Sequence, residues 1–366
     1  MKKLWLPLVV CLALFAAACG DSDEPAATPE TTEAAPEVTE APAWPDKIVF
    51  GFVPSQEQET LQDDIQPFID VLEAALGIEV EGVVTTDYTG LVTAMGTGTA
   101  DLGAFGPFGY VLGTQQFDNI EVLIQSIRFG SATYHGQWFT NDPSLCDDTP
   151  LPASALENSA GGIVQVAALD AVALQVGVAF GDDGPELTDA TDDGTAISPG
   201  SSCNADLSNV EGLTVAYTSE SSTSGYLFPA LQLLGLGLDP QADVTAVFAG
   251  SHDAAVTAVY NGDADVGLSF DDARRTIRRD SPDVGEKVIV FNITGEIPND
   301  VVAVNKSLPQ DLKDAIYDAI DAYLATEEGE AVFDAIYGWT GIRRAVEGDF
   351  DIVRQAAENL GITDPP

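Results

Sequence analysis

The sequence has few basic residues: 366 residues include 14 Lys and Arg against 59 Asp and Glu, and the formal net charge is −45. A chain this acidic repels a phosphate backbone, so we expect no nucleic-acid partner. The charge instead suits a solvated, secreted surface. Because salt screens charges beyond about 10 Å, a local anion site with close, well-aimed donors is compatible with this composition.

Histidine and cysteine are also scarce, with two histidines and four cysteines in the whole chain. There is no CxxC or HExxH spacing, so we expect neither a metal site nor a cofactor. There is also no GxSxG elbow that would project a nucleophilic serine, and we therefore expect no catalytic residue.

Residues 1–19 contain two lysines, an apolar run from Leu4 to Phe15 and small residues before Cys19. This run is too short for a membrane span and predicts an export signal. The residues before Cys19 resemble a bacterial lipobox, which implies lipidation of Cys19 and a lipoprotein that is anchored to the outer face of the cytoplasmic membrane or is periplasmic. Since Ala16 replaces the usual leucine, cleavage without lipid, giving a freely secreted protein, is the alternative.

Residues 20–45 are rich in Asp, Glu, Ala, Thr and Pro and have almost no large apolar side chain to bury. Such a composition predicts a disordered tether. The remaining 320 or so residues are enough for two lobes with buried cores, and we expect them to function as a monomer.

The first part of this body alternates strand and helix patterns. We predict strands at Lys47–Pro54, Ile78–Val84 and Ala100–Phe105, and helices at Leu61–Leu76 and Thr89–Met95. Alternating units of this length predict an α/β fold with parallel sheet and helices on both faces. Ligands on such sheets bind at the carboxyl ends of the strands.

The same pattern recurs in the second part. Strands are predicted at Leu213–Tyr217, Val244–Phe248 and Val266–Phe270, helices at Gly225–Leu234 and Asp253–Tyr260, and a helical tail at Gln310–Leu360. We therefore expect two lobes around a hinge cleft. The first lobe comprises residues 46–138, completed by 298–366, and the second comprises residues 139–297.

Residues 142–209 interrupt the alternation and are predicted to form an insertion in the second lobe. Its apolar stretch, Gly161–Gly181, includes Asp170 and alternates like a strand, so we do not expect it to span a membrane. Cys146 and Cys203 are the two cysteines left outside the signal and the lipid site. In an oxidising compartment they suggest a disulfide, which would contribute about 4 kcal/mol.

Two predicted helix starts carry side chains that can hold an anion. Ser222, Thr223 and Ser224 precede Gly225. The first turn of a helix has backbone N–H groups without partners, the three residues add hydroxyl donors, and Gly225 allows an anion to approach the backbone closely. The alternative is an ordinary Ser/Thr cap. His252 lies at the second start and could donate to an oxyanion, although a histidine there is more often a surface or capping residue.

Five segments together resemble, in order, the signature blocks of the PhnD-like family of phosphonate- and phosphite-binding proteins. They are Thr86–Met95, Ala104–Leu112, Ser221–Pro229, Gly250–Gly267 and Glu296–Val304. The resemblance implies a type II periplasmic-binding fold. It also implies a solute-binding protein that captures a phosphonate, phosphite or phosphate and delivers it to the permease of an ABC importer.

The resemblance also implies the residues that bind the ligand. Carried onto this sequence, they are Tyr88, Tyr134, Ser222, Thr223, Ser224, His252, Asp272 and Asp300. Asp272 stands where many relatives have glutamate, one methylene longer, which bears on any contact with a ligand amine.

Arg274, Arg275, Arg278 and Arg279 form the one dense basic cluster of the sequence. We expect a solvated helix face that balances the acidic surface, with a phosphate site or permease docking as alternatives. For the whole chain, the alternatives to an importer of phosphorus oxyanions are a binding protein for sulfonate or nitrate, a secreted phosphoester or phosphonate hydrolase, and a structural or signalling lipoprotein.

Overall fold

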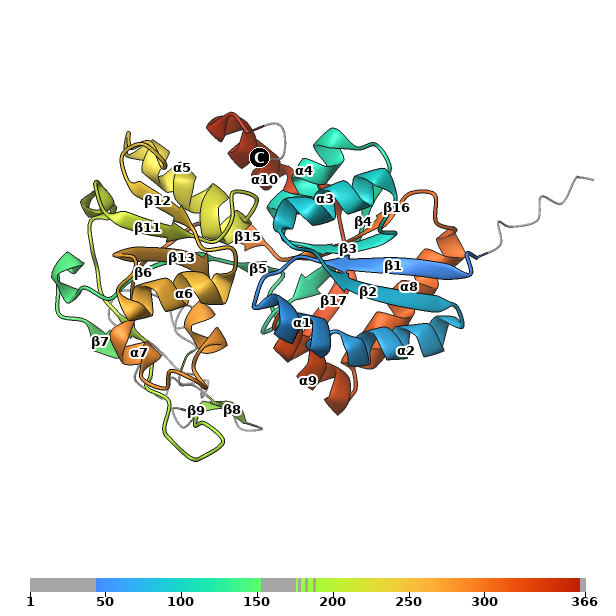
Figure 1. Cartoon of the computed structure of the whole chain (residues 1–366), viewed down its shortest axis with the longest axis horizontal. Helices are drawn as coiled ribbons and strands as arrows, with labels where there is room; N and C mark the ends of the chain where they lie inside the picture. The colour runs from blue at the N-terminus through green and yellow to red at the C-terminus, as the bar shows by residue number, and fades with distance from the viewer. Residues whose placement is uncertain (1–43, 153–175, 177–178, 182–183, 187–188, 363–366) are drawn as a thin grey trace, which may run out of the picture. The chain divides into compact units, whose positions relative to one another are not determined.

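The computed structural model describes residues 44–152, 176, 179–181, 184–186 and 189–362, which belong to one compact unit (Figure 1). The expected signal, Cys19, nearly all of the tether and most of the stretch Gly161–Gly181 lie outside the described residues. Within the described part, no helix is long and apolar enough to cross a membrane.

The first lobe is built on a six-stranded sheet in the order β17-β4-β16-β3-β1-β2. Its strands are β1 (Lys47–Phe52), β2 (Glu79–Val84), β3 (Leu102–Phe105), β4 (Ile120–Ile127), β16 (Val301–Asn305) and β17 (Gly341–Arg344). Its helices are α1 (Gln58–Asp64), α2 (Gln66–Leu76), α3 (Tyr88–Thr97), α4 (Pro107–Gln116), α8 (Gln310–Leu324) and α9 (Glu327–Ile336).

The second lobe is built on a seven-stranded sheet in the order β12-β11-β13-β6-β14-β10-β7. Its strands are β6 (Gly136–Thr140), β7 (Leu151–Pro152), β10 (Ser201–Ser202), β11 (Thr214–Tyr217), β12 (Thr245–Phe248), β13 (Val266–Phe270) and β14 (Ile289–Ile293). Its helices are α5 (Phe228–Gly235), α6 (His252–Asn261) and α7 (Val284–Lys287), and β8 (Ala179–Gly181) pairs with β9 (Gly184–Glu186) as a separate hairpin.

Two short strands carry the chain between the sheets. β5 (Thr133–Tyr134) leads from β4 to β6, β15 (Ile297–Pro298) leads from β14 back to β16, and the two pair antiparallel. Each sheet thus has a parallel core of three strands followed by an antiparallel strand that arrives from the other lobe. The predicted parallel sheet forms this core of each lobe, and β6 and β16, which enter immediately after a crossing, add strands that run in the opposite direction.

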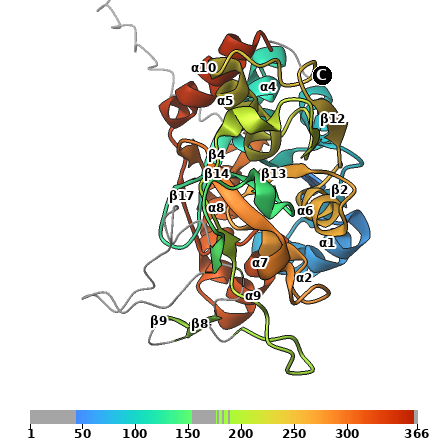
Figure 2. The same cartoon turned by 90° about the vertical axis from the view of Figure 1, so that its left-hand side faces the viewer.

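Most predicted elements appear within a few residues of their expected bounds, with two differences. The expected helix Leu61–Leu76 begins earlier and is divided at Ile65, because Pro67 has no N–H to continue the first helix. The expected helical tail is interrupted by β17, which pairs with β4 at the sheet edge. After β17, α10 (Asp351–Leu360) packs against α4 and α5 (Figure 1, Figure 2).

Cys146 and Cys203 form a disulfide that joins two points 57 residues apart in the second lobe. Cys203 is fully buried in a cluster with Trp138 and Phe291 beside the seven-stranded sheet. The bridge therefore fastens the base of the insertion to the hydrophobic core of this lobe.

Candidate functional site

A cavity of about 240 Å³ lies between the two lobes, at the ends of β1, β3, β11 and β13. Seven of the eight residues expected to bind the ligand line it. They are Tyr88, Tyr134, Ser222, Thr223, Ser224, His252 and Asp300. Because these residues come from both lobes, a ligand held here would contact both walls of the cleft.

The hydroxyl triplet forms the start of a helix. Ser222 is the N-cap residue and accepts a hydrogen bond from Gly225 N at 3.1 Å, and the chain then makes one π-helical turn, Thr223–Leu227, before α5. A Cβ on Gly225 would lie 2.2 Å from Thr218 Oγ1, so only glycine fits there. The triplet is at most 3% exposed. Buried hydroxyls and the N–H groups of a first helical turn can together hold an anion, and we call this arrangement the anion cradle.

His252 is held as a neutral donor. It begins α6, where Ser251 caps the helix, and burial followed by the charge of Arg128 lowers the pKa of the ring to about 3. Nδ1 lies 2.7 Å from Ser269 Oγ. When Ser269 donates this hydrogen bond, the single ring proton is on Nε2, which can donate to an oxyanion.

Several contacts cross the cleft. His252 N donates to Ser55 O at 2.9 Å, and Phe108 N, in the first turn of α4, donates to Thr223 Oγ1 at 2.9 Å. Thr89 Oγ1 also lies 3.3 Å from Ser221 Oγ. These contacts couple the anion cradle of the second lobe to the walls of the first lobe.

Two tyrosines supply phenolic donors. Tyr88 opens α3 after the N-cap Asp87, and its buried hydroxyl has no hydrogen-bond partner among the described residues. Burial raises the pKa of Tyr88 well above its ordinary value, with further effects of Tyr337 and Asp300. Burial also raises the pKa of Tyr134, although a hydrogen bond with Ser224 acts in the opposite direction. Both hydroxyls therefore stay protonated and can donate.

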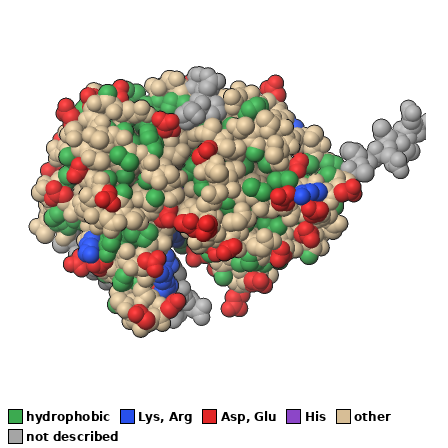
Figure 3. Space-filling view, viewed as in Figure 1, with side chains coloured by type: hydrophobic (Ala, Val, Ile, Leu, Met, Phe, Trp, Pro, Cys, Tyr) green, Lys and Arg blue, Asp and Glu red, His purple; other side chains and the backbone are tan. Residues whose placement is uncertain are grey.

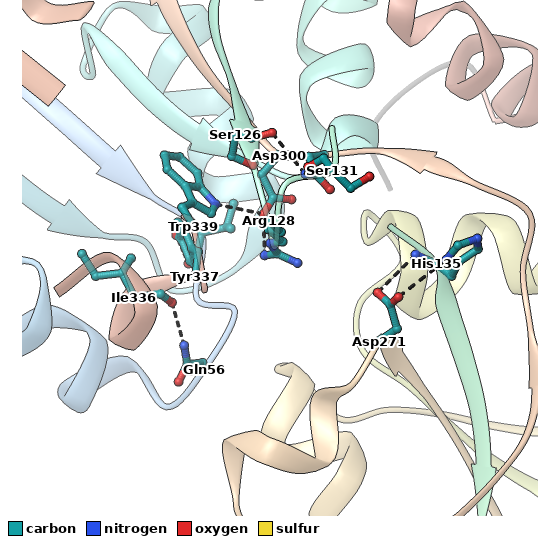
Figure 4. Close-up of polar contacts among 12 residues, drawn as sticks. Gln56, Ser126, Arg128, Ser131, His135, Asp271, Asp300, Ile336, Tyr337 and Trp339 are labelled. Atoms are coloured by element: carbon teal, nitrogen blue, oxygen red, sulfur yellow. Dashed lines mark hydrogen bonds and ion pairs between the residues drawn. The ribbon is translucent and has the colours of Figure 1, made fainter. Parts of the chain in front are cut away.

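Asp300 is paired, and its partner was missed by the sequence analysis. Arg128 Nη2 lies 2.7 Å from Asp300 Oδ2, and Trp339 Nε1 donates to the same oxygen at 3.4 Å (Figure 4). The Arg128 guanidinium also lies over the rings of Tyr134 and Phe270, and its Nε is buried without a partner among the described residues. The sequence signal that could have identified Arg128 is its position directly after β4, the strand that leads into a crossing between the lobes.

The structure does not place Asp272 in the pocket, contrary to expectation. Its carboxylate is fully buried and bonds Arg274 through both oxygens, at 2.9 Å to Nε and 2.8 Å to Nη2. It also accepts from Val176 N. Asp271, its neighbour, pairs with His135 at the start of β6 (Figure 4). A buried arginine needs a carboxylate, and Asp272 serves that purpose.

The expectation of a solvated helix face for the arginine cluster is also wrong. Arg274 is 0% exposed and donates to Ser201 O and Val288 O. Arg275, Arg278 and Arg279 instead line the mouth of the same cavity. Arg274 and Arg275 lie in a short turn, Ala273–Thr276, and Arg278 and Arg279 follow it, so the four side chains do not share the face of one helix.

No group of three or more His, Cys, Asp or Glu side chains in the described ranges could hold a metal ion. The donors around the cavity are instead hydroxyl, phenol, imidazole, guanidinium and backbone N–H groups. Such a set binds an oxyanion through hydrogen bonds that it directs from several sides.

Two α/β lobes joined by two crossings, with an anion cradle between them, define the class of type II periplasmic binding proteins. The model of the family described as "ABC transporter, phosphonate, periplasmic substrate-binding protein" matches residues 50–350. The chain belongs to this family. Its members are extracytoplasmic transport proteins rather than enzymes, so the hydrolase alternative is set aside.

Individual relatives agree with this assignment. The Phosphate-import protein PhnD of Mycolicibacterium smegmatis is 28% identical over 369 residues, covering 96% of this chain and 94% of the relative. The crystal structure of PhnD1 from Prochlorococcus marinus with methylphosphonate is similar with a TM-score of 0.64 at 18% identity, over 87% of this chain and 99% of that one. A binding protein of an ABC phosphonate transporter from Pseudomonas aeruginosa gives 0.63 at 18% identity over 88% of each chain. The fold and family expected from the sequence are confirmed.

Proposed function

We propose that this protein captures a small phosphorus oxyanion, namely phosphate, phosphite or a phosphonate, in the cavity between its lobes and delivers it to an ABC permease. The observation that carries the proposal is a pair of buried donors without a partner among the described residues, Tyr88 Oη and Arg128 Nε. Leaving a buried donor unpaired costs about 1–3 kcal/mol, and an oxyanion between them would accept from both.

The remaining donors support the same ligand. Ser222, Thr223 and Ser224 line the cavity at the start of a helix, where their hydroxyls and N–H groups can donate, and His252 can add its Nε2–H. The names of two relatives are consistent with this class, since one imports phosphate and the other was crystallised with methylphosphonate.

Asp300 favours phosphorus over sulfur oxyanions. Its Oδ2 accepts from Arg128 and Trp339, whereas none of the described residues donates to Oδ1. Oδ1 can therefore accept from the P–O–H of a singly protonated phosphorus oxyanion. Sulfate has no such proton at neutral pH, so its oxygens would face the carboxylate without a hydrogen bond.

For the location, we propose that the lipid on Cys19 and the tether of residues 20–45 hold the binding body at the outer face of the cytoplasmic membrane. The export signal and the resemblance to a lipobox support this arrangement. A monomer suffices, because one chain supplies both walls of the cavity.

A calorimetric panel tests the proposal. We expect binding of phosphate, phosphite or methylphosphonate, weak binding of sulfate and no turnover of phosphate esters. Failure of every phosphorus ligand to bind, or turnover of an ester, would contradict it.

A further inference from the structure

The mouth of the cavity is strongly basic, although the protein is strongly acidic. Four arginines line the cavity, namely Arg128, Arg275, Arg278 and Arg279, whereas only Asp300 and Asp334 supply carboxylates. The chain as a whole has 14 basic residues and a formal charge of −45. Figure 3 shows basic side chains along one wall of the notch below the centre of the molecule. This concentration of positive charge indicates a local preference for anions.

These arginines are not equally neutralised. Arg278 and Arg279 share one carboxylate, that of Asp189, at 3.0 and 3.6 Å. Arg275 has no carboxylate within 4.0 Å among the described residues. Asp334 has the largest effect among the carboxylates that raise the pKa of Arg275, and Asp334 is exposed to solvent, which screens its charge.

Arg275 is held in place by packing. Its guanidinium carbon lies 5.0 Å from the ring centre of Phe129 and 6.0 Å from that of Phe270, and Gly338 leaves room for its Nη2. Two aromatic rings and a glycine thus orient a half-buried cation whose polar edge lines the cavity. Such pre-organisation lowers the entropy that a bound anion would cost.

Arg275 and Arg128 are neighbours around a single ring. The Arg128 guanidinium carbon lies 5.3 Å from the centre of Phe270, the same ring that Arg275 contacts. Burial, followed by the charge of Arg128, lowers the pKa of Arg275 to about 10, so Arg275 remains cationic at neutral pH. Two like charges held close together repel each other, and an anion between or beside them relieves the repulsion.

The cavity offers few carboxylates to a ligand ammonium group: Asp334 is the one lining carboxylate without an ion pair among the described residues, and it is exposed to solvent, which screens its charge. Asp272 is bonded to Arg274 outside the cavity, and Asp300 is bonded to Arg128. A water molecule takes up roughly 30 Å³ in the liquid, so a cavity of about 240 Å³ has room for a tetrahedral oxyanion and a short tail.

We infer that the ligand carries, besides its phosphorus oxyanion, a second anionic group such as a carboxylate, which lies against Arg275. The inference rests on the proposed function and narrows its ligand class. The phosphorus end occupies the hydroxyl cradle at Ser222–Ser224, and the second anion extends along Phe270 toward the arginine cluster. An aminoalkyl tail would instead bring a cation to this basic mouth.

Calorimetry on the full mature chain tests this with three probes: methylphosphonate, 2-aminoethylphosphonate and phosphonoacetate. We expect phosphonoacetate to bind at least about tenfold more tightly than methylphosphonate, because a charge-assisted contact in a partly buried site is worth this much. We expect 2-aminoethylphosphonate to bind more weakly than methylphosphonate. The variant Arg275→Gln should remove most of the advantage of phosphonoacetate, and Arg275→Lys should retain much of it because the charge is kept.

Arg344→Gln is the matched control, since Arg344 pairs with Asp314 and lies over Tyr317, outside the cavity. This variant should keep the wild-type ratio of affinities. If wild-type protein binds methylphosphonate as tightly as phosphonoacetate, or binds 2-aminoethylphosphonate most tightly, the inference is wrong and the proposed function stands. If none of the three binds, the inference fails, and the proposed function fails with it only if phosphate and phosphite do not bind either. The wild-type comparison decides the matter even if Arg275→Gln does not fold.

Discussion

Arg128 and Asp300 form a 2.7 Å ion pair in the wall of the cavity, although 172 residues separate them in the chain. Arg128 directly follows β4 and Asp300 directly precedes β16, and these strands are antiparallel neighbours. The end of one strand therefore meets the start of the other. Their side chains are 9% and 15% exposed. Because the pair is largely buried, removing either charge would leave the other without compensation and destabilise the fold.

Replacement of Arg128 by glutamine should affect both binding and stability. Loss of one member of a largely buried pair costs about 3–5 kcal/mol of unfolding free energy. An uncompensated Asp300 would also face the ligand, so we expect a loss in affinity of about a hundredfold or more. The double variant Arg128→Gln, Asp300→Asn should recover stability in denaturant unfolding but not affinity in calorimetry. Recovery of affinity in the double variant would refute a direct role for Arg128.

The hydroxyl triplet should be essential for binding. Replacing Ser222, Thr223 and Ser224 together by alanine removes three donors, and each hydrogen bond to a charged group contributes roughly 1.5–3 kcal/mol. We expect a loss of several orders of magnitude in affinity. Ser222→Ala alone should cost about 1 kcal/mol of stability, because Ser222 caps the helix start. A folded triple variant with parental affinity would place the site elsewhere.

Asp300 should set the preference for phosphate over sulfate. We expect wild-type protein to favour phosphate by at least about tenfold at neutral pH, since sulfate has no proton to donate to Asp300 Oδ1. Asp300→Asn should narrow this ratio, because an amide can donate to a fully deprotonated oxyanion. The control Asp314→Asn removes an exposed carboxylate that pairs with Arg344 and should keep the ratio. Competition measurements with the two anions decide between these outcomes.

His252 should make stability depend on pH. Its folded-state pKa of about 3 lies below the ordinary value of 6.5, so the unfolded state takes up a proton first as the pH falls. Stability is therefore complete above pH 6.5 and is lost between pH 6.5 and 3, by about 2 kcal/mol at pH 5. Between pH 7.5 and pH 5, the unfolding free energy of the wild-type protein should fall by about 2 kcal/mol more than that of the variant His252→Gln. Equal losses in the two proteins would show that the imidazole titrates normally in the folded state.

The disulfide between Cys146 and Cys203 should be detectable as a linked peptide pair by mass spectrometry without reduction. Closing a loop of 57 residues stabilises the folded state by about 4 kcal/mol in the chain-entropy model. Reduction, or the variant Cys146→Ser, should lower the melting temperature by several degrees. Two free thiols in protein prepared under oxidising conditions would contradict the pairing.

The sequence by itself determined the features that depend on neighbouring residues. Strand and helix patterns predicted most of the elements of both lobes, and capping signals predicted the helix starts at Ser222–Ser224 and at His252, because capping and periodicity are local properties. The antiparallel entry of β6 and β16 and the strand β17 needed the fold, because they depend on which strands become neighbours.

Only the tertiary structure decided which charge meets which. The sequence analysis assigned both Asp272 and Asp300 to the ligand site. In the structure Asp272 forms an ion pair with the buried Arg274, whereas Asp300 lines the cavity beside Arg128. Arg275 likewise reads as part of a surface cluster until packing against Phe270 places it at the cavity mouth. A buried charge pairs with an opposite charge that the fold brings within a few ångströms. Strand register and packing between segments far apart in the chain determine which charge that is.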